Sequence, residues 1–514
     1  MKAPSIQTIS CQIPARQKYR WTRMSMGTIY CAIITALTAC NAVGPNYHLP
    51  PQAVINRPEI NAQFVAAEKG TESNKDLPVH WWHLYQDDVL NNLIEKAFVA
   101  NADLRVAAAN LRASRAIVAD VEHEKIPKAG ASIAPGYGRP SAVEMGLPMT
   151  LPDSGNYDIG IKMSYQVDLF GKIARAIESA KADDEATAAA YDMVKITVAA
   201  DTAHAYADLC AAGQQMQVQQ AAIDLQERYT KSLADRIRIG RGTALDMSRS
   251  TALLAQIKSQ RPSLQAQQQV ARYRLAALLG EAPGSPTTEH ISCNKVPQVA
   301  TLIPVGNGQQ LMQRRPDIRK AERSLASATA KIGVATADLY PQIQFGGSIG
   351  STGLLPGFGN GDAFRWEVGP LISWSFPATS SAHIKIAYAE AGSEAALAKF
   401  DATVLAALKE ADSALTVYAR ELDKHQSLAT MREQNALSVK QAERLFQFGR
   451  IDFFSLLKEL IFIWIFRKNL INVNQRVVFM LNLAICHSFL NKLANSWSRT
   501  VLRIVRRVQY FYCL

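Results

Sequence analysis

Residues 157–169 alternate between apolar positions and polar or glycine positions, over a length that could cross a membrane. Successive side chains of a β-strand point to opposite faces, so this pattern predicts a strand with one apolar and one polar face. A tilted transmembrane strand needs about 9–11 residues, and the stretch meets that length. The apolar positions are Tyr157, Ile159, Ile161, Met163, Tyr165, Val167 and Leu169.

A different kind of sequence follows this strand. No proline occurs between Pro152 and Pro262, and residues 172–239 are rich in alanine and other small residues. As one continuous helix, that stretch would be roughly 100 Å long, at about 1.5 Å per residue. Its Asp, Glu, Lys and Gln content excludes a helix buried in lipid. We therefore expect long helices in water, and only the strands in a membrane.

The body of the chain contains one unit twice. Asp103-Leu104-Arg105 recurs 214 positions later as Asp317-Ile318-Arg319, and further matches keep the same order. An ordered series of this kind indicates an internal duplication. The further matches are Pro127 with Pro341, Tyr165 with Trp374, Tyr191-Asp192 with Phe400-Asp401, and Gly240-Arg241 with Gly449-Arg450.

Each unit predicts the same order of elements: a helix, a proline, a glycine-bearing segment, a loop, the alternating strand, and a very long helix. The long helix runs to a glycine break at Gly240 or Gly449, after which a second helix returns. In the first and second unit, the first helix covers 87–126 and 317–339, the glycine-bearing segment 129–138 and 342–350, and the alternating strand 157–169 and 364–376.

Two strands per unit give about four strands per chain, and known transmembrane barrels have at least eight. Unpaired backbone groups at a sheet edge in lipid cost several kcal/mol each, so other copies of the chain must supply the missing strands. The expected fold class is mainly α with a membrane β-barrel, which several copies share and which stands on a bundle of long helices. The alternative is a soluble four-stranded sheet beside a helical bundle.

The net charge of +12 does not indicate nucleic-acid binding, because it lies at the two ends of the chain. Residues 1–39 carry five basic side chains and residues 461–514 carry eight, without an acidic residue in either segment. The nearly neutral body between them offers no basic surface to a phosphate backbone.

No chemical site stands out in the sequence. The seven cysteines include no C-x-x-C pair, and His80 and His83 flank Trp81 and Trp82 without a completing carboxylate, which favours aromatic anchoring over metal binding. We also find no nucleophile–base pair or phosphate-binding loop. We therefore expect neither a metal nor an enzyme.

Residues 1–39 are typical of an export signal, since basic residues precede a short apolar segment at 26–37. That segment is too short to span a bilayer as a helix. Leu37-Thr38-Ala39-Cys40 then resembles a bacterial lipobox, in which the cysteine becomes the lipidated first residue of the mature protein. The alternative is a plain signal peptide followed by an incidental cysteine.

Four segments together resemble the outer membrane factors of tripartite efflux pumps, of the TolC/OprM and NodT-like type. They are the start CNAVGPNY (40–47), the segment 81–107, the junction YQVDLFGK (165–172) and the segment 314–343, which begins RRPDIRKAERS. The resemblance covers roughly 40–460, in the expected order. It identifies Cys40 as the lipid anchor, and Asn41 after it favours the outer membrane over the inner.

The resemblance implies a homotrimer, in which each chain gives four strands to a 12-stranded barrel and its helices to an α-helical tunnel. Its partners would be a periplasmic adaptor (membrane fusion) protein and an inner-membrane transporter of the RND type. The channel would export drugs or other small molecules passively from the periplasm to the outside. Apart from the lipid on Cys40, no cofactor is implied.

Two sets of site residues follow from the resemblance. The glycine breaks match the periplasmic tips that contact the adaptor, although each could also be only a hairpin turn. The tip residues are Gly240, Thr243, Leu245, Gly449, Ile451 and Phe453. The family often closes its tunnel just beyond the second tip with acidic residues, but the matching positions here are Ser455 and Lys458, and neither is acidic. The first repeat keeps Asp246 but has Arg249 at the matching later position. A constriction lined by Arg249 and Lys458 would favour anions.

Beyond about Glu459 the resemblance ends. The run LIFIWIF (460–466) replaces the expected amphipathic helix, and no acidic residue follows to 514. Three interpretations remain: a frameshift or sequencing error, a degraded last helix, or a genuine basic tail. The expected domains are a signal peptide (1–39), an N-terminal extension with the anchor (40–86), a first repeat (87–300), a second repeat (301–460) and this atypical tail (461–514).

Two alternative functions stay open. The same architecture serves as an outer-membrane conduit for type I protein secretion, although the lipobox and the start of the mature chain favour small-molecule efflux. A lipid-anchored coiled-coil stalk without a pore is the other alternative, but a stalk has no use for two strands of membrane length.

Overall fold

The computed structural model describes most of the chain between Ala42 and Phe479. The described residues are 42–61, 72–73, 80–139, 141, 146, 148–150, 152–298, 303–304, 314–374, 379–452, 455–456, 458–459, 461–462 and 469–479. The predicted signal peptide, the anchor Cys40, the tip residue Phe453 and the end of the tail lie outside them.

The chain forms two compact units. The first comprises 1–45, 122–176 and 330–387, and the second comprises 46–121, 177–329 and 388–514. Corresponding pieces of the two repeats thus build the same unit: one strand pair from each repeat lies in the first unit, and one long helix from each continues through the second.

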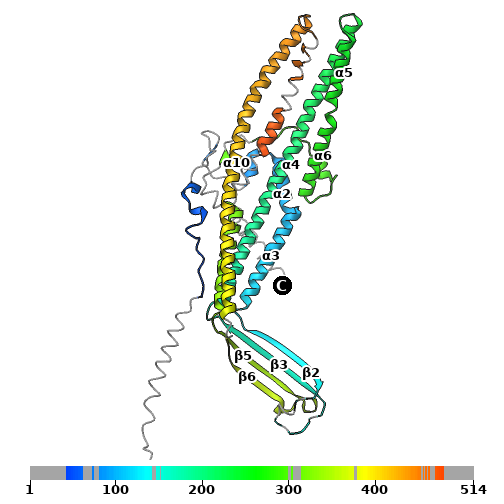
Figure 1. Ribbon diagram of the computed structural model, residues 1–514. Coiled ribbons are helices and arrows are strands. Elements are labelled where there is room, and N and C mark those ends of the chain that lie inside the picture. Colours follow the sequence, from blue (N-terminus) through cyan, green and yellow to red (C-terminus); the bar gives the residue numbers. More distant parts are fainter. Residues whose placement is uncertain are drawn as a thin grey trace, which may run out of the picture. The chain divides into compact units, whose positions relative to one another are not determined.

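The first unit contains a four-stranded antiparallel sheet in the order β2-β3-β5-β6 (Figure 1). The strands are β2 (Lys128–Gly138), β3 (Ser154–Val167), β5 (Gln342–Leu354) and β6 (Phe364–Ser373). The predicted strands at 157–169 and 364–376 are therefore confirmed, with small shifts at their ends. The two glycine-bearing segments are strands as well.

The register aligns most of the apolar residues of the four strands on one face, with Leu371, which pairs with Gln344, as an exception. Ala131, Ile161, Ile349 and Trp366 form one row across the sheet, and Gly130, Lys162, Ser348 and Glu367 form the next. Successive rows point to opposite faces, so the sheet has an apolar and a polar side. Ile161, Ile349 and Trp366 are 52%, 51% and 68% exposed, so the described part of the chain leaves this row of the apolar face uncovered.

Long helices make up most of the remainder. They are α2 (Asp88–Ala100), α3 (Ala102–His123), α4 (Lys172–Arg238), α5 (Ala244–Lys258), α6 (Arg261–Leu278), α9 (Pro316–Ala337) and α10 (Thr379–Gln447). The shorter elements are η1 (Val54–Asn56), η2 (Pro58–Asn61), η3 (Trp81–Tyr85), α7 (Pro286–Glu289), η4 (Leu355–Gly357), η5 (Gly361–Ala363) and a parallel strand pair of β1 (Glu72–Ser73) with β4 (Ile303–Pro304).

The 67 residues of α4 correspond to a helix of roughly 100 Å, as the sequence predicted. Its start is capped by Asp168, whose carboxylate accepts hydrogen bonds from the backbone N–H groups of Ile173 and Ala174 at 3.0 and 2.8 Å. Within the described part of the chain, none of the helices contains an apolar stretch of the length that a membrane span requires.

The prediction of one helix over 87–126 is wrong, because Asn101 separates α2 from α3. The Asn101 backbone is extended (φ −59°, ψ 131°), and its side-chain oxygen accepts hydrogen bonds from the N–H groups of Asp103 and Leu104 at 2.9 and 3.2 Å. Asparagine competes with helical hydrogen bonds in this way, and it starts a new helix here as its N-cap.

The core of the second unit begins at the tryptophan pair of η3. Trp81 and Trp82 are each only 1% exposed, and the ring of Trp82 packs edge-on against Phe98 at 5.4 Å. The pair shares one hydrophobic cluster with residues of α2, α4, α6 and α10, among them Ile94, Leu209, Leu275 and Phe400. The two tryptophans therefore anchor this segment in the core, while His80 and His83 beside them are exposed.

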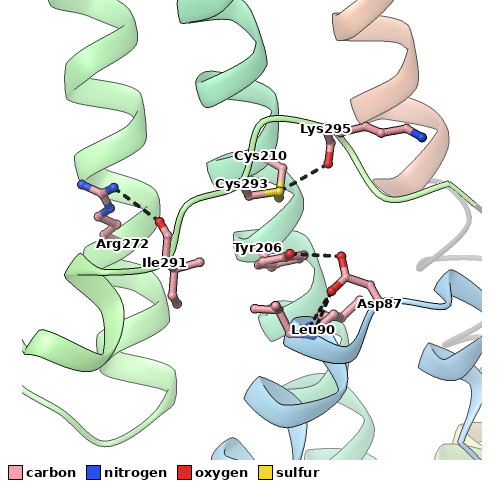
Figure 2. The surroundings of a disulfide bond; sticks show 9 residues. Asp87, Leu90, Tyr206, Cys210, Arg272, Ile291, Cys293 and Lys295 are labelled. Atoms are coloured by element: carbon pink, nitrogen blue, oxygen red, sulfur yellow. Dashed lines mark hydrogen bonds between the residues drawn. A yellow bond between two sulfur atoms is a disulfide. The ribbon is translucent and has the colours of Figure 1, made fainter.

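A disulfide between Cys210 and Cys293, which the sequence did not predict, ties the middle of α4 to the connection between the repeats (Figure 2). Below it in Figure 2, the Tyr206 hydroxyl donates to the Asp87 carboxylate at 3.0 Å, and Asp87 in turn caps α2. A Cβ on Gly213 would lie 2.2 Å from the Cys293 carbonyl oxygen, so glycine permits this close approach. Disulfides persist in oxidising compartments such as the bacterial periplasm.

Candidate functional site

The two predicted tips have the same backbone structure. Gly240 and Gly449 both adopt positive φ angles, +75° and +69°, with no neighbour that a Cβ would meet. The N–H groups of each glycine and of the arginine after it donate to carbonyls at the end of the preceding helix, in the first tip to Ile237 and Arg236 at 3.0 and 2.8 Å. The second tip repeats these two bonds 209 positions later. Glycine is needed here for the left-handed helix C-terminus.

A capping arrangement starts the returning segment at each tip. Thr243 and Asp246 form a capping box at the start of α5, with the Asp246 N–H donating to the Thr243 hydroxyl at 3.2 Å. At the second tip, Asp452 accepts a hydrogen bond from the Ser455 N–H at 2.8 Å. The Ser455 hydroxyl and this N–H hold the pKa of Asp452 below its ordinary value.

The ends of α4 and α10 pack together behind the tips. Leu233, Val439, Ala442, Phe446 and Leu456 form a small hydrophobic cluster. The guanidinium of Arg236 lies 3.9 Å from the centre of the Phe446 ring, and the Tyr229 hydroxyl donates to Glu443 at 2.7 Å. Burial and then this carboxylate raise the pKa of Tyr229, so the hydroxyl stays protonated.

The structure separates the predicted tip residues into two kinds. Thr243 and Leu245 are exposed, Leu245 to 57%. Ile451 instead packs against the hydrophobic cluster behind the tips. Sequence reasoning missed Ile239 and Phe448, which are 64% and 79% exposed. The sequence could have indicated both residues, because each directly precedes a tip glycine and the two are again 209 positions apart.

The four predicted constriction residues lie just beyond the tips. Asp246 and Ser455 already take part in the capping arrangements, while Arg249 and Lys458 are exposed on the returning segments. Arg249 and Lys458 also occupy equivalent positions of the two repeats. No group of three or more potential metal ligands occurs among the described residues.

Comparisons with known proteins identify a family and several similar proteins. The sequence profile of the family described as "Outer membrane efflux protein" matches residues 93–281 and 307–459. Nodulation protein T of Rhizobium leguminosarum bv. trifolii is 29% identical over 387 residues, which are 75% of this chain and 80% of that protein. Outer membrane protein OprJ of Pseudomonas aeruginosa is 25% identical over 423 residues, 81% of this chain and 86% of that protein.

Among solved structures, the outer-membrane channel OprN superposes with a TM-score of 0.80 at 30% identity, covering 87% of this chain and 99% of that chain. The match therefore includes both the strand segments and the long helices of each repeat. The chain belongs to the outer membrane efflux protein family, and it is an outer-membrane channel component of a tripartite efflux system.

Proposed function

We propose that three copies of this chain close a 12-stranded barrel and a helical tunnel, through which drugs or other small molecules leave the periplasm passively. The observation that carries this proposal is the sheet of the first unit. Its outer strands, β2 and β6, each pair with only one described strand, and its apolar face is uncovered. A sheet with open edges cannot lie in lipid, so neighbouring copies must pair with both edges.

Uncovered apolar residues on the helices of the second unit support the same assembly. Val106 and Ile117 of α3 are each 60% exposed, and Tyr388 and Leu405 of α10 are 84% and 51% exposed. Leu104 is the only described residue of α3 that is buried. Helices of other copies would cover these positions and form the tunnel wall.

A pair of neighbouring substitutions in β2 tests the membrane sheet. Ile133 belongs to the apolar face and is 75% exposed, whereas Ala134 shares a row with Asp158 on the polar face. Arginine on the lipid face near mid-membrane costs about 2–4 kcal/mol, and arginine facing a water-filled lumen costs little. Ile133→Arg should strongly reduce the trimer recovered from outer membranes, and Ala134→Arg should not. Equal recovery would contradict a lipid-facing sheet.

Transport itself can be measured as dye accumulation in a strain that lacks its own channel of this class. Cells that express this chain with its adaptor and transporter should accumulate less dye than cells without it. An assembled trimer that leaves dye accumulation unchanged would contradict small-molecule export.

We also propose that the tips contact a periplasmic adaptor, which couples the channel to an inner-membrane transporter of the RND type. Leu245, Ile239 and Phe448 provide exposed apolar contacts beside the tip glycines. The predicted contacts Gly240, Thr243, Gly449 and Ile451 lie at the same two tips, and Phe453 stays a predicted contact outside the described residues. Site-specific photo-crosslinkers at 239 and 448 should capture the adaptor, whereas a crosslinker at the exposed Val106 should not.

Two further parts of the proposal concern the anchor and the pore. Cys40 would carry the covalent lipid, which incorporation of labelled palmitate measures, with Cys40→Ser as the control. Arg249 and Lys458, near Asp246 and Ser455, would line a constriction that favours anions. The reversal potential of the channel in planar bilayers measures this preference, and cation selectivity at neutral pH would contradict it.

A further inference from the structure

The segment that directly follows the predicted anchor is held in the first unit by a buried arginine. Arg175, in the first turn of α4, is 4% exposed. Its Nε donates to the Val43 carbonyl at 3.0 Å, and its Nη2 to the carbonyls of Gly44 at 3.1 Å and Ala42 at 3.4 Å. The Val43 N–H donates to the Phe170 carbonyl at 3.1 Å. One guanidinium thus serves three consecutive carbonyls of the segment.

Three glycines make room for this contact. A Cβ on Gly171 would lie 2.3 Å from the Cβ of Ala42, and a Cβ on Gly44 would lie 2.4 Å from the Cα of Gly333. A Cβ on Gly333 would come within 2.9 Å of the Val43 carbonyl oxygen and still closer to the Arg175 side chain. Gly44 and Gly171 also have positive φ angles, +85° and +75°. We call Gly171, Arg175 and Gly333 the N-terminal socket.

Three of the motifs that resemble the family each contribute one glycine to this contact. Gly44 belongs to the start CNAVGPNY, Gly171 to the junction YQVDLFGK, and Gly333 to the segment 314–343. These motifs are far apart in the sequence, and the structure brings one glycine of each to the same place. Such close backbone packing tolerates no side chain, and it fixes the segment more tightly than surface contacts would.

Covalent geometry links the socket to the anchor. Cys40 precedes Ala42 by two residues, and two residues of extended chain span at most about 7 Å. A lipid on Cys40 must therefore enter the membrane close to the point where β3 ends and α4 begins. The rings of Phe170 and Tyr340 stack beside this point at 4.5 Å. Aromatic side chains are enriched at the boundary between lipid and water.

We propose that the N-terminal socket couples the lipid anchor to the sheet, with Arg175 as the positioning residue that sets the depth at which the sheet enters the membrane. This inference rests on the proposed lipidation of Cys40. Without the socket, the anchor would still tether the chain, but the loose segment 41–49 would no longer define where the sheet lies relative to the bilayer surface.

A double-mutant cycle tests the coupling. Arg175→Ala is made in the lipidated chain, and in a chain exported by a cleavable secretory signal with serine at position 40. The readout is the fraction of protein recovered as a membrane-inserted, protease-resistant trimer. Because Arg175→Ala releases the segment that follows the lipid anchor, we expect a decrease of about tenfold in the lipidated chain. In the chain without lipid we expect less than about twofold, since the anchor that the socket positions is missing.

Further variants separate positioning from folding. Gly333→Ala keeps Arg175 but pushes against the segment, so it should behave as Arg175→Ala does. Gly392→Ala, where a Cβ would meet nothing within 4 Å, is the matched control and should have no effect. Arg175→Lys keeps the charge but donates from a single nitrogen, whereas Arg175 donates from both Nε and Nη2, so it should have an intermediate effect. Hydrogen exchange of the Val43 amide reports release of the segment directly.

Each outcome decides the proposal. An equal loss with and without the lipid would overturn it, because Arg175 would then only stabilise the fold. Unchanged insertion in both backgrounds, or loss of palmitate label in Arg175→Ala, would overturn it as well. Absence of label in the unmodified chain would instead refute the proposed lipidation of Cys40, which the palmitate measurement distinguishes.

Discussion

The two repeats form the same turn at their tips, but the segments that follow the two turns differ. In the first repeat, α4 returns as α5 and α6, which are helical over 244–258 and 261–278. In the second repeat, α10 is followed by described helical residues at 455–456, 458–459, 461–462 and 469–479. The tips share their backbone hydrogen bonds, yet the sequence that follows the second tip has lost the composition of the first.

Both returning segments nevertheless pack on the same part of α4. Asp208 accepts hydrogen bonds from Arg274 of α6 at 3.0 Å and from Gln475 of the second return at 2.7 Å. Gln215, further along α4, donates to Asn472 at 2.9 Å. Asp208, Gln215, Arg274 and Gln475 also line an open cavity of about 400 Å³. The difference between the repeats shows that packing on α4 survives a large change in sequence.

Among the variants that test this comparison, Ile471→Asp should lower the stability of the protein most. Ile471 is 3% exposed and belongs to the main core cluster, so the substitution buries an unpaired carboxylate. We expect a loss of about 3–5 kcal/mol in the free energy of unfolding, measured by denaturant titration of the chain in detergent. Asn469→Asp, at an exposed position of the same segment, is the control. If both variants were equally stable, the segment 469–479 would not replace a return helix.

Removal of the disulfide should weaken the first repeat alone. Cys210 and Cys293 are 83 positions apart, and a crosslink of this span stabilises by about 2–4 kcal/mol. The double variant Cys210→Ala/Cys293→Ala should therefore show faster hydrogen exchange around residues 281–298, while the exchange of 469–479 stays unchanged. Equal acceleration in both segments would show that the two returns are not independent.

Asp208→Ala should affect both returns at once, because both donate to its carboxylate. Its side chain is 22% exposed, and hydrogen bonds to charged groups contribute about 1.5–3 kcal/mol. We expect this loss in thermal or chemical unfolding, with Asp201→Ala on an exposed position of α4 as the control. Hydrogen exchange of the same variant should accelerate in α6 and in 469–479. Acceleration confined to peptides of α6 would show that the hydrogen bond from Gln475 does not stabilise the second returning segment.

The sequence was sufficient for the strands, the long helices and the tips, because each depends on a local pattern. Alternation at 157–169 and the glycines at 240 and 449 directly determine backbone structure. Two features depend on contacts between distant residues and could not be predicted: the pairing of Cys210 with Cys293, and the packing of Arg175 on the segment 42–44. The break at Asn101 was missed because its hydrogen bonds compete with a helix pattern that continues on both sides.

Asp452→Ala should have the smallest effect on stability, and it should affect the second tip without affecting the first. Loss of this cap should cost about 1 kcal/mol, seen as faster exchange of the Ser455 amide. Hydrogen bonds from Ser455 lower the pKa of Asp452 from its ordinary value of 3.8, so the stabilisation is complete above that value. It disappears as the pH falls through the lower pKa of the folded state.

Asp452→Asn keeps an acceptor that does not titrate, so it should remove this pH dependence. The Asp246 amide, bonded to the Thr243 hydroxyl, is the internal control. Acid-induced loss of protection at Ser455 in Asp452→Asn as well would show that the second tip opens for another reason than its cap.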